Sequence, residues 1–240
     1  MIPKVIHYCW FGRNEKSKAM LDCIESWRKY CPDYEIVEWN EDNYDINAIP
    51  FISDAYRAGK WAFVSDYARL EIIYNEGGIY LDTDVEVIKS LDPLLSLSAY
   101  AGFEGDTTIA TGLGFGAVKA HPMVKALMED YHHRDFPEDG DYMSVACPFI
   151  NTQVFEKFGF QPNGQKQTVN GMTLFPKDYF NPKSSQTYLT EITENTYSIH
   201  HYDASWRKGG SARKQKLIRA FTKLFGEKNL VRLKKFLKKN

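Results

Sequence analysis

Two carboxylates stand one residue apart in the stretch GGIYLDTDVEV, where Asp82 and Asp84 follow a short apolar run. Such a run is typical of a buried strand, and two side chains at i and i+2 can converge where a chain bends out of its sheet. Mg²⁺ and Mn²⁺ prefer carboxylate oxygens as ligands, and such an ion neutralises the charge of a bound diphosphate. The pair therefore indicates a site for a divalent metal ion and a phosphate ester.

The spacing of the two carboxylates has little specificity by itself, because 16 Asp residues in 240 produce about one Asp-x-Asp pair by chance. A second pair, Asp139 and Asp141, stands in the stretch FPEDGDY, which is typical of a solvated loop. The first pair differs in its setting, because an expected helix, the glycines Gly77 and Gly78 and an apolar strand precede it.

The helix before that strand carries the motif SDYAR, in which Ser65, Asp66 and Arg69 lie within one turn. Asp66 and Arg69 stand at i and i+3 and therefore share a face of the helix. One interpretation is an exposed structural ion pair. The other is a functional pair whose charged groups bind a polar ligand, because charged partners make the stronger hydrogen bonds. The motif alone leaves both interpretations open.

Two adjacent histidines, His200 and His201, stand in the late stretch SIHHYDASW. Consecutive side chains of a strand face opposite sides, so at most one of the two points into a given site. Imidazole is a good ligand for ions such as Mn²⁺, although a buried histidine can also serve only to satisfy hydrogen bonds in a core. The pair is therefore a candidate source of one further metal ligand.

The elements that must position these residues follow from the apolar pattern. Over the first 90 residues we expect strand 4–10, helix 16–30, strand 34–39, two helices within 49–78, the second over 61–75, and a strand, break and strand over 79–88. We further expect strands at 100–104 and 112–118, a helix at 121–134, and little periodicity from 159 to 196. Strands that alternate with helices imply an α/β fold with a mainly parallel sheet, helices on both faces, and ligands at the carboxyl ends of the strands.

The combined motifs resemble a known enzyme family. The stretch WAFVSDYARLEIIYNEGGIYLDTDVEV, preceded by IPKVIHYCWFG and followed by IHHYDASW, resembles glycosyltransferase family 32 and, more distantly, the glucosylating domains of clostridial toxins. The resemblance is dense over residues 1–90 and returns near 200–206. It implies a GT-A fold with a mixed, mainly parallel sheet, a nucleotide-diphosphate sugar as donor, a divalent metal ion, usually Mn²⁺ and otherwise Mg²⁺, and transfer with retention of anomeric configuration.

The resemblance also implies roles for individual residues. Trp10 matches the aromatic residue that stacks on the donor base, although such a residue can also belong to the core. Asp66 and Arg69 match the pair that holds the hydroxyls of the donor sugar and ribose. Asp82 matches an acid that contacts sugar, ribose and, through water, the metal ion, and Asp84 matches the direct metal ligand. Asp66, Arg69 and Asp82 are therefore the catalytic candidates.

Further candidates lie beside these residues. Ser65 and Tyr80 are expected to contact the donor. In related retaining transferases a late histidine followed by an aromatic residue closes over the diphosphate, and His201 matches this pattern better than its neighbour. We therefore expect His201 as the third metal ligand, with Ser205 and Trp206 on the phosphate side of the donor.

One stretch departs from the family. ACPFINT has Cys147 before Pro148, where the family has a Gly-Pro motif. For this reason Pro148, Asn151 and Thr152 receive no assigned role in binding the acceptor.

The composition bounds the class of protein. With 240 residues, 43% of them apolar, the chain can bury a sizeable core, and we expect one globular domain over residues 1–206. The four cysteines have no zinc-type spacing and are too few for a disulfide scaffold, so we expect free thiols. No apolar run reaches about 20 residues and the first residues do not resemble a signal peptide. We therefore expect a cytoplasmic protein.

The tail, residues 207–240, differs from this domain. It has 13 basic residues and one acidic residue, a net charge of +12, against −13 for the rest of the chain. Its apolar residues follow helical spacing, with Leu217, Phe221, Leu224 and Phe225 on one face. A basic amphipathic helix of this kind can bind the inner, anionic surface of a membrane. Alternatively, it can pack on the acidic domain of residues 1–206. No nucleic-acid binding module is recognisable.

The leading hypothesis is a glycosyltransferase that transfers a sugar, preferably from a UDP-sugar, to a glycan or lipid-linked acceptor in surface polysaccharide assembly. A haloacid-dehalogenase-like phosphohydrolase also has an aspartate pair after a strand, but its motif lies near the N-terminus and Glu86 does not fit its pattern. A protein that binds sugar nucleotides without turnover is the third alternative.

Overall fold

The computed structural model describes residues 1–137, 140–202, 212–226 and 229–230. Its sheet contains three adjacent parallel strands, in the order β2 (Glu35–Trp39), β1 (Val5–Cys9) and β3 (Gly78–Tyr80). Helix α1 (Lys18–Tyr30) joins β1 to β2, and helices α2 (Pro50–Arg57) and α3 (Trp61–Glu76) lead from β2 to β3. The order of elements predicted for the first 90 residues is therefore confirmed.

Local sequence signals explain where two of these helices begin or end. The hydroxyl of Ser17 caps α1 and accepts the backbone N–H of Met20 at 3.3 Å. Helix α3 ends at Gly77, whose φ of +71° is a conformation that glycine adopts without strain. The chain then enters β3 directly, so the C-terminal end of α3 lies next to the N-terminal start of β3.

The remainder of the sheet mixes directions. The strand order is β2-β1-β3-β7-β5-β9-β8, with the short β6 paired to β5. Strand β7 runs antiparallel to both β3 and β5, whereas β9 runs parallel to β5. The bounds are β5 (Ala99–Phe103), β6 (Ile109–Ala110), β7 (Phe115–Ala117), β8 (Gln167–Val169) and β9 (Met172–Phe175). The predicted α/β fold with a mixed sheet is confirmed.

A second, two-stranded sheet connects distant parts of the sequence. Strand β4 (Val85–Val87) pairs antiparallel with β10 (Ser198–His200). Trp27 of α1 supports this sheet, because its indole Nε1–H donates to the carbonyl of Val85 at 2.7 Å. The pairing brings the late histidines next to the residues that follow β3.

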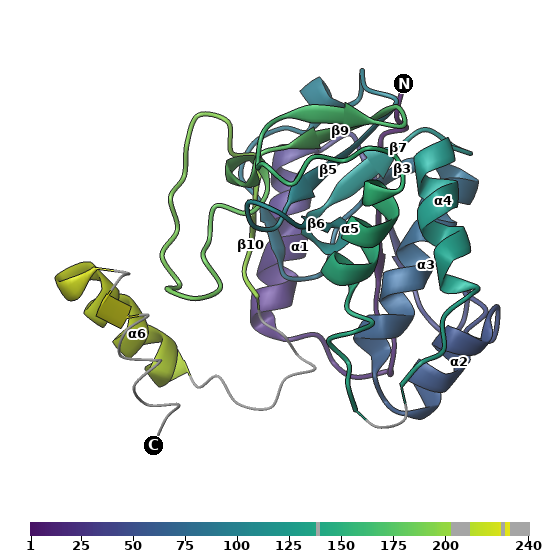
Figure 1. Cartoon of the computed structure of the whole chain (residues 1–240), viewed down its shortest axis with the longest axis horizontal. Helices are drawn as coiled ribbons and strands as arrows, with labels where there is room; N and C mark the ends of the chain where they lie inside the picture. The colour runs from purple at the N-terminus through teal and green to yellow at the C-terminus, as the bar shows by residue number, and fades with distance from the viewer. Residues whose placement is uncertain (138–139, 203–211, 227–228, 231–240) are drawn as a thin grey trace.

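The core has two parts because side chains alternate along the strands. On one face of the large sheet, Ile6 and Tyr8 of β1 pack with Trp27 of α1. On the other face, Cys9 and Tyr80 belong to a larger core formed with α2, α3, α4 (Pro122–Tyr131) and α5 (Cys147–Glu156). Figure 1 shows α1 apart from the group formed by α2, α3 and α4. Helices therefore cover both faces, as predicted.

Helix α5 and the hairpin of β8 and β9 were not predicted from the sequence, although both have local signals. Helix α5 begins with Cys147 and has a proline at one of its first positions, a common start for a helix. Strands β8 and β9 form a hairpin around Asn170 and Gly171, which both have positive φ. Asn-Gly is the typical sequence of such a tight turn. Three short 3₁₀ helices complete the fold: η1 (Asp92–Leu94), η2 (Thr111–Leu113) and η3 (Lys177–Tyr179).

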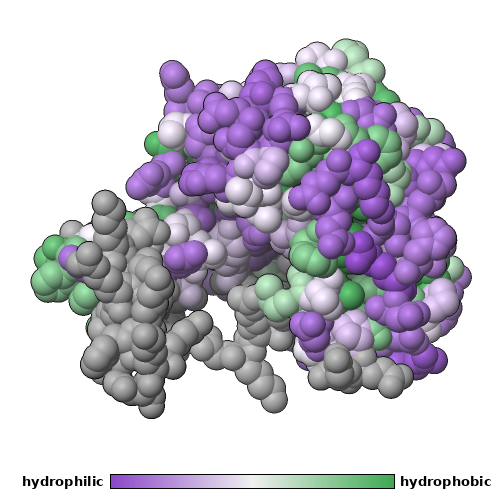
Figure 2. Space-filling model, viewed as in Figure 1, coloured by the Kyte–Doolittle hydropathy of each residue, from purple (hydrophilic) through white to green (hydrophobic). Residues whose placement is uncertain are grey.

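The C-terminal tail contains helix α6 (Ala212–Phe225). Leu217, Leu224 and Phe225 are 65%, 77% and 57% exposed, and an apolar patch is visible at the left edge of Figure 2, where Figure 1 places this helix. The expected boundary at residue 206 lies outside the described residues. Among the described residues, no helix is long and apolar enough to cross a membrane.

Candidate active site

The two carboxylates of the Asp-x-Asp motif lie in the turn between β3 and β4. The backbone N–H of Val85 donates to the carbonyl of Asp82 at 3.0 Å and closes this turn. Side chains on a straight strand would not approach each other in this way, so the turn brings Asp82 and Asp84 together. Asp84 is only 14% exposed and Asp82 26%. The motif is therefore half-buried at the carboxyl end of β3.

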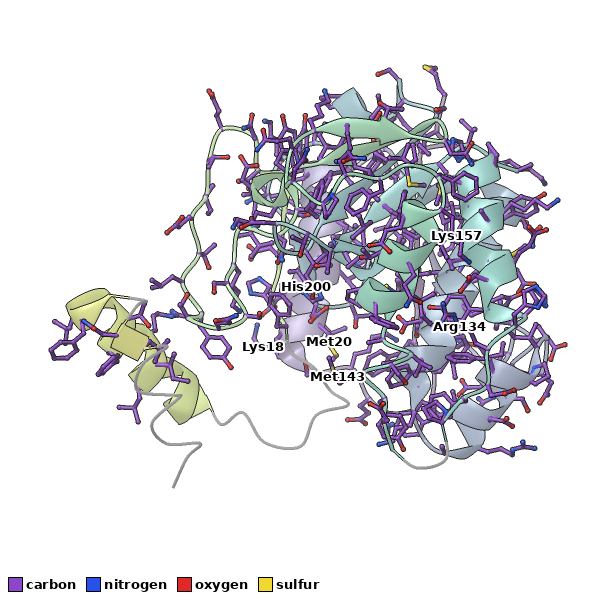
Figure 3. The ribbon with its side chains drawn as sticks, in the orientation of Figure 1. Lys18, Met20, Arg134, Met143, Lys157 and His200 are labelled. Carbon is purple, nitrogen blue, oxygen red and sulfur yellow. The ribbon has the colours of Figure 1, made fainter. Side chains whose placement is uncertain are left out.

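A histidine joins the two carboxylates. Ligand atoms of Asp82, Asp84 and His200 all lie within 4.8 Å of one another, and the Nε2 atom of His200 lies 3.3 Å from Oδ1 of Asp84. Figure 3 labels His200 at the end of β10. Although burial opposes the charged imidazolium, the neighbouring Asp84 carboxylate raises the pKa of His200. Two carboxylates and one imidazole are a ligand set that fits Mn²⁺ or Mg²⁺.

The position of His201 differs from the expectation that it is the third ligand. Its backbone N–H donates to the carbonyl of Asp84 at 2.9 Å, but its ring points to Glu86, with Nε2 2.8 Å from Oε2. Lys183 donates to the carbonyl of His201 at 2.7 Å, and His201, Glu86 and Lys183 border a separate hollow of about 290 Å³. Because β10 places its neighbouring side chains on opposite sides, His200 takes the position expected for His201.

Asp66 and Arg69 form a buried ion pair rather than an exposed one. Nη2 of Arg69 lies 2.8 Å from Oδ1 of Asp66, and the two side chains are 4% and 11% exposed. The same Nη2 lies 3.3 Å from Oδ1 of Asp82, so the guanidinium connects α3 to the Asp-x-Asp motif. Removing one partner of such a buried pair would leave an uncompensated charge, so the pair costs more to break than a surface ion pair.

Two further contacts hold the guanidinium in place. Its Nε–H donates to the carbonyl of Ser65 at 3.0 Å, and its carbon lies 4.9 Å from the centre of the Tyr80 ring. The hydroxyl of Tyr80 donates to Asp82 at 3.0 Å. Tyr80 is buried beneath these charged groups. The Ser65 hydroxyl donates to the carbonyl of Trp61 within α3. The sequence-predicted residues Ser65 and Tyr80 therefore both touch the ion-pair network.

Burial raises the pKa values of two carboxyl groups in the site. It raises the pKa of Asp66 to about 6, although Arg69 opposes this shift. It also raises the pKa of Asp82, with Arg69 again opposing and Asp84 contributing. The guanidinium of Arg69 thus faces two carboxylates, from Asp66 and Asp82, and Asp84 adds a third negative charge close to Asp82. A divalent cation would relieve this excess of negative charge.

Trp10 lies at the same end of the sheet, immediately after β1. Its ring is half-buried, its Nε1–H donates to the carbonyl of Asn14 at 2.6 Å, and the ammonium of Lys16 lies 5.4 Å from the ring centre. The ring also packs against the part of the core that contains Tyr8 and Trp27. Ser205 and Trp206, expected on the phosphate side, lie outside the described residues.

The structure adds residues that sequence reasoning did not assign. A Cβ atom on Gly112 would lie 2.6 Å from Oδ2 of Asp82 and 2.8 Å from Nη1 of Arg69, so any other residue there would displace these two side chains. Gly112 belongs to η2, at the end of the Gly- and Thr-rich stretch GDTTIATG. Cys147, at the start of α5, has its Sγ 3.8 Å from Nη1 of Arg69. Glycine richness was a signal for the first residue; the second had none.

Comparisons with known proteins agree with this geometry. Residues 17–101 match the family described as "Glycosyltransferase sugar-binding region containing DXD motif". The chain is 29% identical over 148 residues to inositol phosphoceramide mannosyltransferase 3 of Schizosaccharomyces pombe, covering 60% of this chain and 41% of that protein. It is 28% identical over 224 residues to mannosyl phosphorylinositol ceramide synthase CSH1 of Saccharomyces cerevisiae, covering 87% of this chain and 55% of that protein.

The chain thus spans about half the length of these curated relatives. Among solved structures, the PaToxG glycosyltransferase superposes with a TM-score of 0.50 at 16% identity, covering 65% of this chain and 68% of that one. At this identity the likeness concerns the fold alone, and the fold is that of a GT-A glycosyltransferase.

Proposed function

We propose that this protein, which carries the DXD sugar-binding region of the glycosyltransferases, is a metal-dependent enzyme that transfers a sugar from a nucleotide-diphosphate donor with retention of configuration. The observation that carries the proposal is the convergence of Asp82, Asp84 and His200 within 4.8 Å, beside the buried pair Asp66 and Arg69. A metal site next to charged groups that can accept and donate hydrogen bonds is the arrangement that a sugar diphosphate requires.

In the proposed reaction the bond between the anomeric carbon and the diphosphate oxygen breaks, and a bond to an acceptor hydroxyl forms as that hydroxyl loses its proton. Asp82, Asp84 and His200 would hold Mn²⁺ or Mg²⁺, which neutralises the charge of the departing diphosphate. Asp66 and Arg69 would bind donor hydroxyls and fix the sugar, and the Trp10 ring would stack on the base. Burial of the ion pair excludes water and strengthens these contacts.

For the substrates, we propose a UDP-sugar as donor and a glycan or lipid-linked acceptor in surface polysaccharide assembly. The names of two relatives support a lipid-linked acceptor, because both proteins act on phosphoinositol ceramides. The same names mention mannose, so GDP-sugars belong in any screen. Family resemblance supports the UDP preference and the retention of configuration.

The test is a screen of UDP- and GDP-sugars for Mn²⁺-dependent hydrolysis, read as release of the nucleoside diphosphate. Asp84→Ala should lower the rate about 10²–10⁴-fold, because it removes a metal ligand and charge compensation for the diphosphate. Asp141→Ala is the matched control, since Asp141 is exposed and belongs to the second Asp-x-Asp pair of the sequence. Full activity of Asp84→Ala in EDTA would refute the proposal, and donor binding without turnover would favour a sensor. Release of inorganic phosphate would favour a phosphohydrolase.

We also propose that the tail, residues 207–240, binds an anionic membrane and places the enzyme peripherally at the cytoplasmic face. The exposure of Leu217, Leu224 and Phe225 supports this assignment over packing on the body, and the tail's net charge of +12 would attract acidic lipids. Deleting residues 213–240 should abolish co-sedimentation with anionic vesicles and leave donor hydrolysis intact. Co-sedimentation that is absent, or unchanged by the deletion, would contradict the assignment.

A further inference from the structure

Cys147 is a buried thiol in direct contact with the donor-binding pair. It is the first residue of α5, is 6% exposed, and its Sγ lies 3.8 Å from Nη1 of Arg69. The backbone of the same residue lowers the pKa of the Asp66 carboxyl group and so lies close to it. Cys147 therefore contacts Arg69 through its side chain and lies near Asp66 through its backbone.

The thiol also contacts the loop on the other side of the site. The hydroxyl of Thr111 lies 3.3 Å from Sγ, within hydrogen-bond distance. Burial raises the pKa of the Cys147 thiol to about 12, so the thiol keeps its proton near neutral pH. That proton is donated to Oδ1 of Asn151, one turn further along α5, at 3.2 Å.

Asn151 extends this set of hydrogen bonds. Its Oδ1 also accepts the backbone N–H of Thr111 at 3.0 Å, and it is fully buried. One turn of α5 thus fixes the start of η2 through Asn151, and Thr152 fixes β6 by accepting the backbone N–H of Ile109 at 3.0 Å. The loop held in this way carries Gly112, the residue whose missing Cβ leaves room for Asp82 and Arg69.

We propose that Cys147 is a positioning residue for sugar transfer: its neutral thiol couples the guanidinium of Arg69 to the loop of Thr111 and Gly112 and thereby sets the place of the donor sugar. The inference rests on the proposed function, because it assigns Arg69 to the donor. Cys147 forms no bond to the substrate in this role. It acts through Arg69 and through the loop, and its replacement should affect turnover more than donor binding.

The side-chain chemistry makes the proposal testable. An alanine at position 147 would remove the sulfur that contacts the Thr111 hydroxyl and the donor to Asn151, and both of these residues are buried. A serine keeps one donor and one acceptor at nearly the same place. Cys31 offers a matched control, because it is a second buried thiol, 1% exposed, at the end of α1 and away from the site.

The experiment compares Cys147→Ala, Cys147→Ser and Cys31→Ala in the full-length chain. In Mn²⁺-dependent hydrolysis of the best donor, Cys147→Ala should lower kcat about 10–100-fold with a smaller change in KM, because a misplaced group costs mainly transition-state alignment. Cys147→Ser should recover to within about threefold of the parent, since it restores the hydrogen bonds. Cys31→Ala should leave both constants unchanged.

A second measurement does not depend on activity. The Nε–H of Arg69 donates to Ser65 within a buried site, so its NMR signal reports the position of the guanidinium. Cys147→Ala should shift or broaden this signal, and Cys147→Ser should restore it. If the parent hydrolyses no sugar nucleotide, the proposed function fails. The NMR comparison still tests whether Cys147 fixes the position of Arg69. An unchanged Arg69 signal in Cys147→Ala, or equal kcat losses in the alanine and serine variants, would overturn the inference.

Discussion

The adjacent histidines at the end of β10, His200 in the strand and His201 directly after it, offer a sharp test of the metal site. His200→Ala removes one of the three side chains whose ligand atoms lie within 4.8 Å of one another and leaves Asp82 and Asp84. Because the His200 side chain is only 14% exposed, water replaces the imidazole poorly. We expect Mn²⁺ affinity to fall about 10–100-fold, which corresponds to about 1.4–2.8 kcal/mol.

His201→Ala is the matched control on the same strand end. Its ring lies against Glu86, with exposed fractions of 33% and 41%, and such a partly exposed pair contributes only about 0.2–1 kcal/mol to stability. We expect Mn²⁺ affinity to change less than about twofold, because no ligand is removed. His200→Asp should bind Mn²⁺ better than His200→Ala, since a carboxylate is also a good ligand for this ion.

The assay is a titration with Mn²⁺ in which the free ion is followed by electron paramagnetic resonance, with melting curves of each apo variant as a check of folding. The reasoning is refuted if His201→Ala weakens Mn²⁺ binding and His200→Ala does not. Equal losses in both variants would mean that the β4–β10 pairing as a whole, rather than the His200 ring, governs the site.

Three further predictions concern the donor. Gly112→Ala should reduce kcat/KM for the donor at least about tenfold with little loss of melting temperature, because the new methyl group displaces Asp82 and Arg69 rather than the core; unaltered kinetics would contradict the close approach. Trp10→Ala should weaken binding of UDP or GDP by about 1–2 kcal/mol in calorimetry, and the parent's tryptophan fluorescence should be quenched by the nucleotide. A variant that melts far lower but binds normally would instead make Trp10 a core residue. Since the Asp66 carboxylate must be charged to hold Arg69 and its pKa is raised to about 6 by burial, kcat/KM at saturating Mn²⁺ should fall as the pH drops through about 6. Asp66→Asn should lower kcat/KM and remove that component of the pH profile, and an identical profile in the variant would exclude Asp66 as its source.

Local sequence determined the N-terminal half of the fold. Apolar periodicity, the Ser17 cap and the glycines after α3 act over a few residues, so β1 to β3 and their helices could be predicted with nearly their observed bounds. The hairpin of β8 and β9 also has a local signal, the Asn170-Gly171 turn, and was missed because its strands are only three and four residues long. Helix α5 was missed although its buried residues Cys147, Ile150, Val154 and Phe155 follow helical spacing.

For the site, the sequence by itself determined the residues that are close in the chain. The spacing of Asp82 and Asp84 and the i, i+3 placement of Asp66 and Arg69 are properties of one turn and one helix. The local sequence did not determine whether that ion pair is exposed or buried. Its burial comes from Asp82, Cys147 and the packing of α3 against the rest of the core.

Only the tertiary structure decided which late histidine joins the carboxylates. Alternation along a strand predicts that His200 and His201 face opposite sides. Which side meets Asp84 depends on the pairing of β10 with β4, whose residues are more than 100 positions apart in the sequence. The contact of Cys147 with Arg69 likewise spans 78 positions. Such contacts arise when elements with independent local signals pack together, and no local pattern records the register in which they meet.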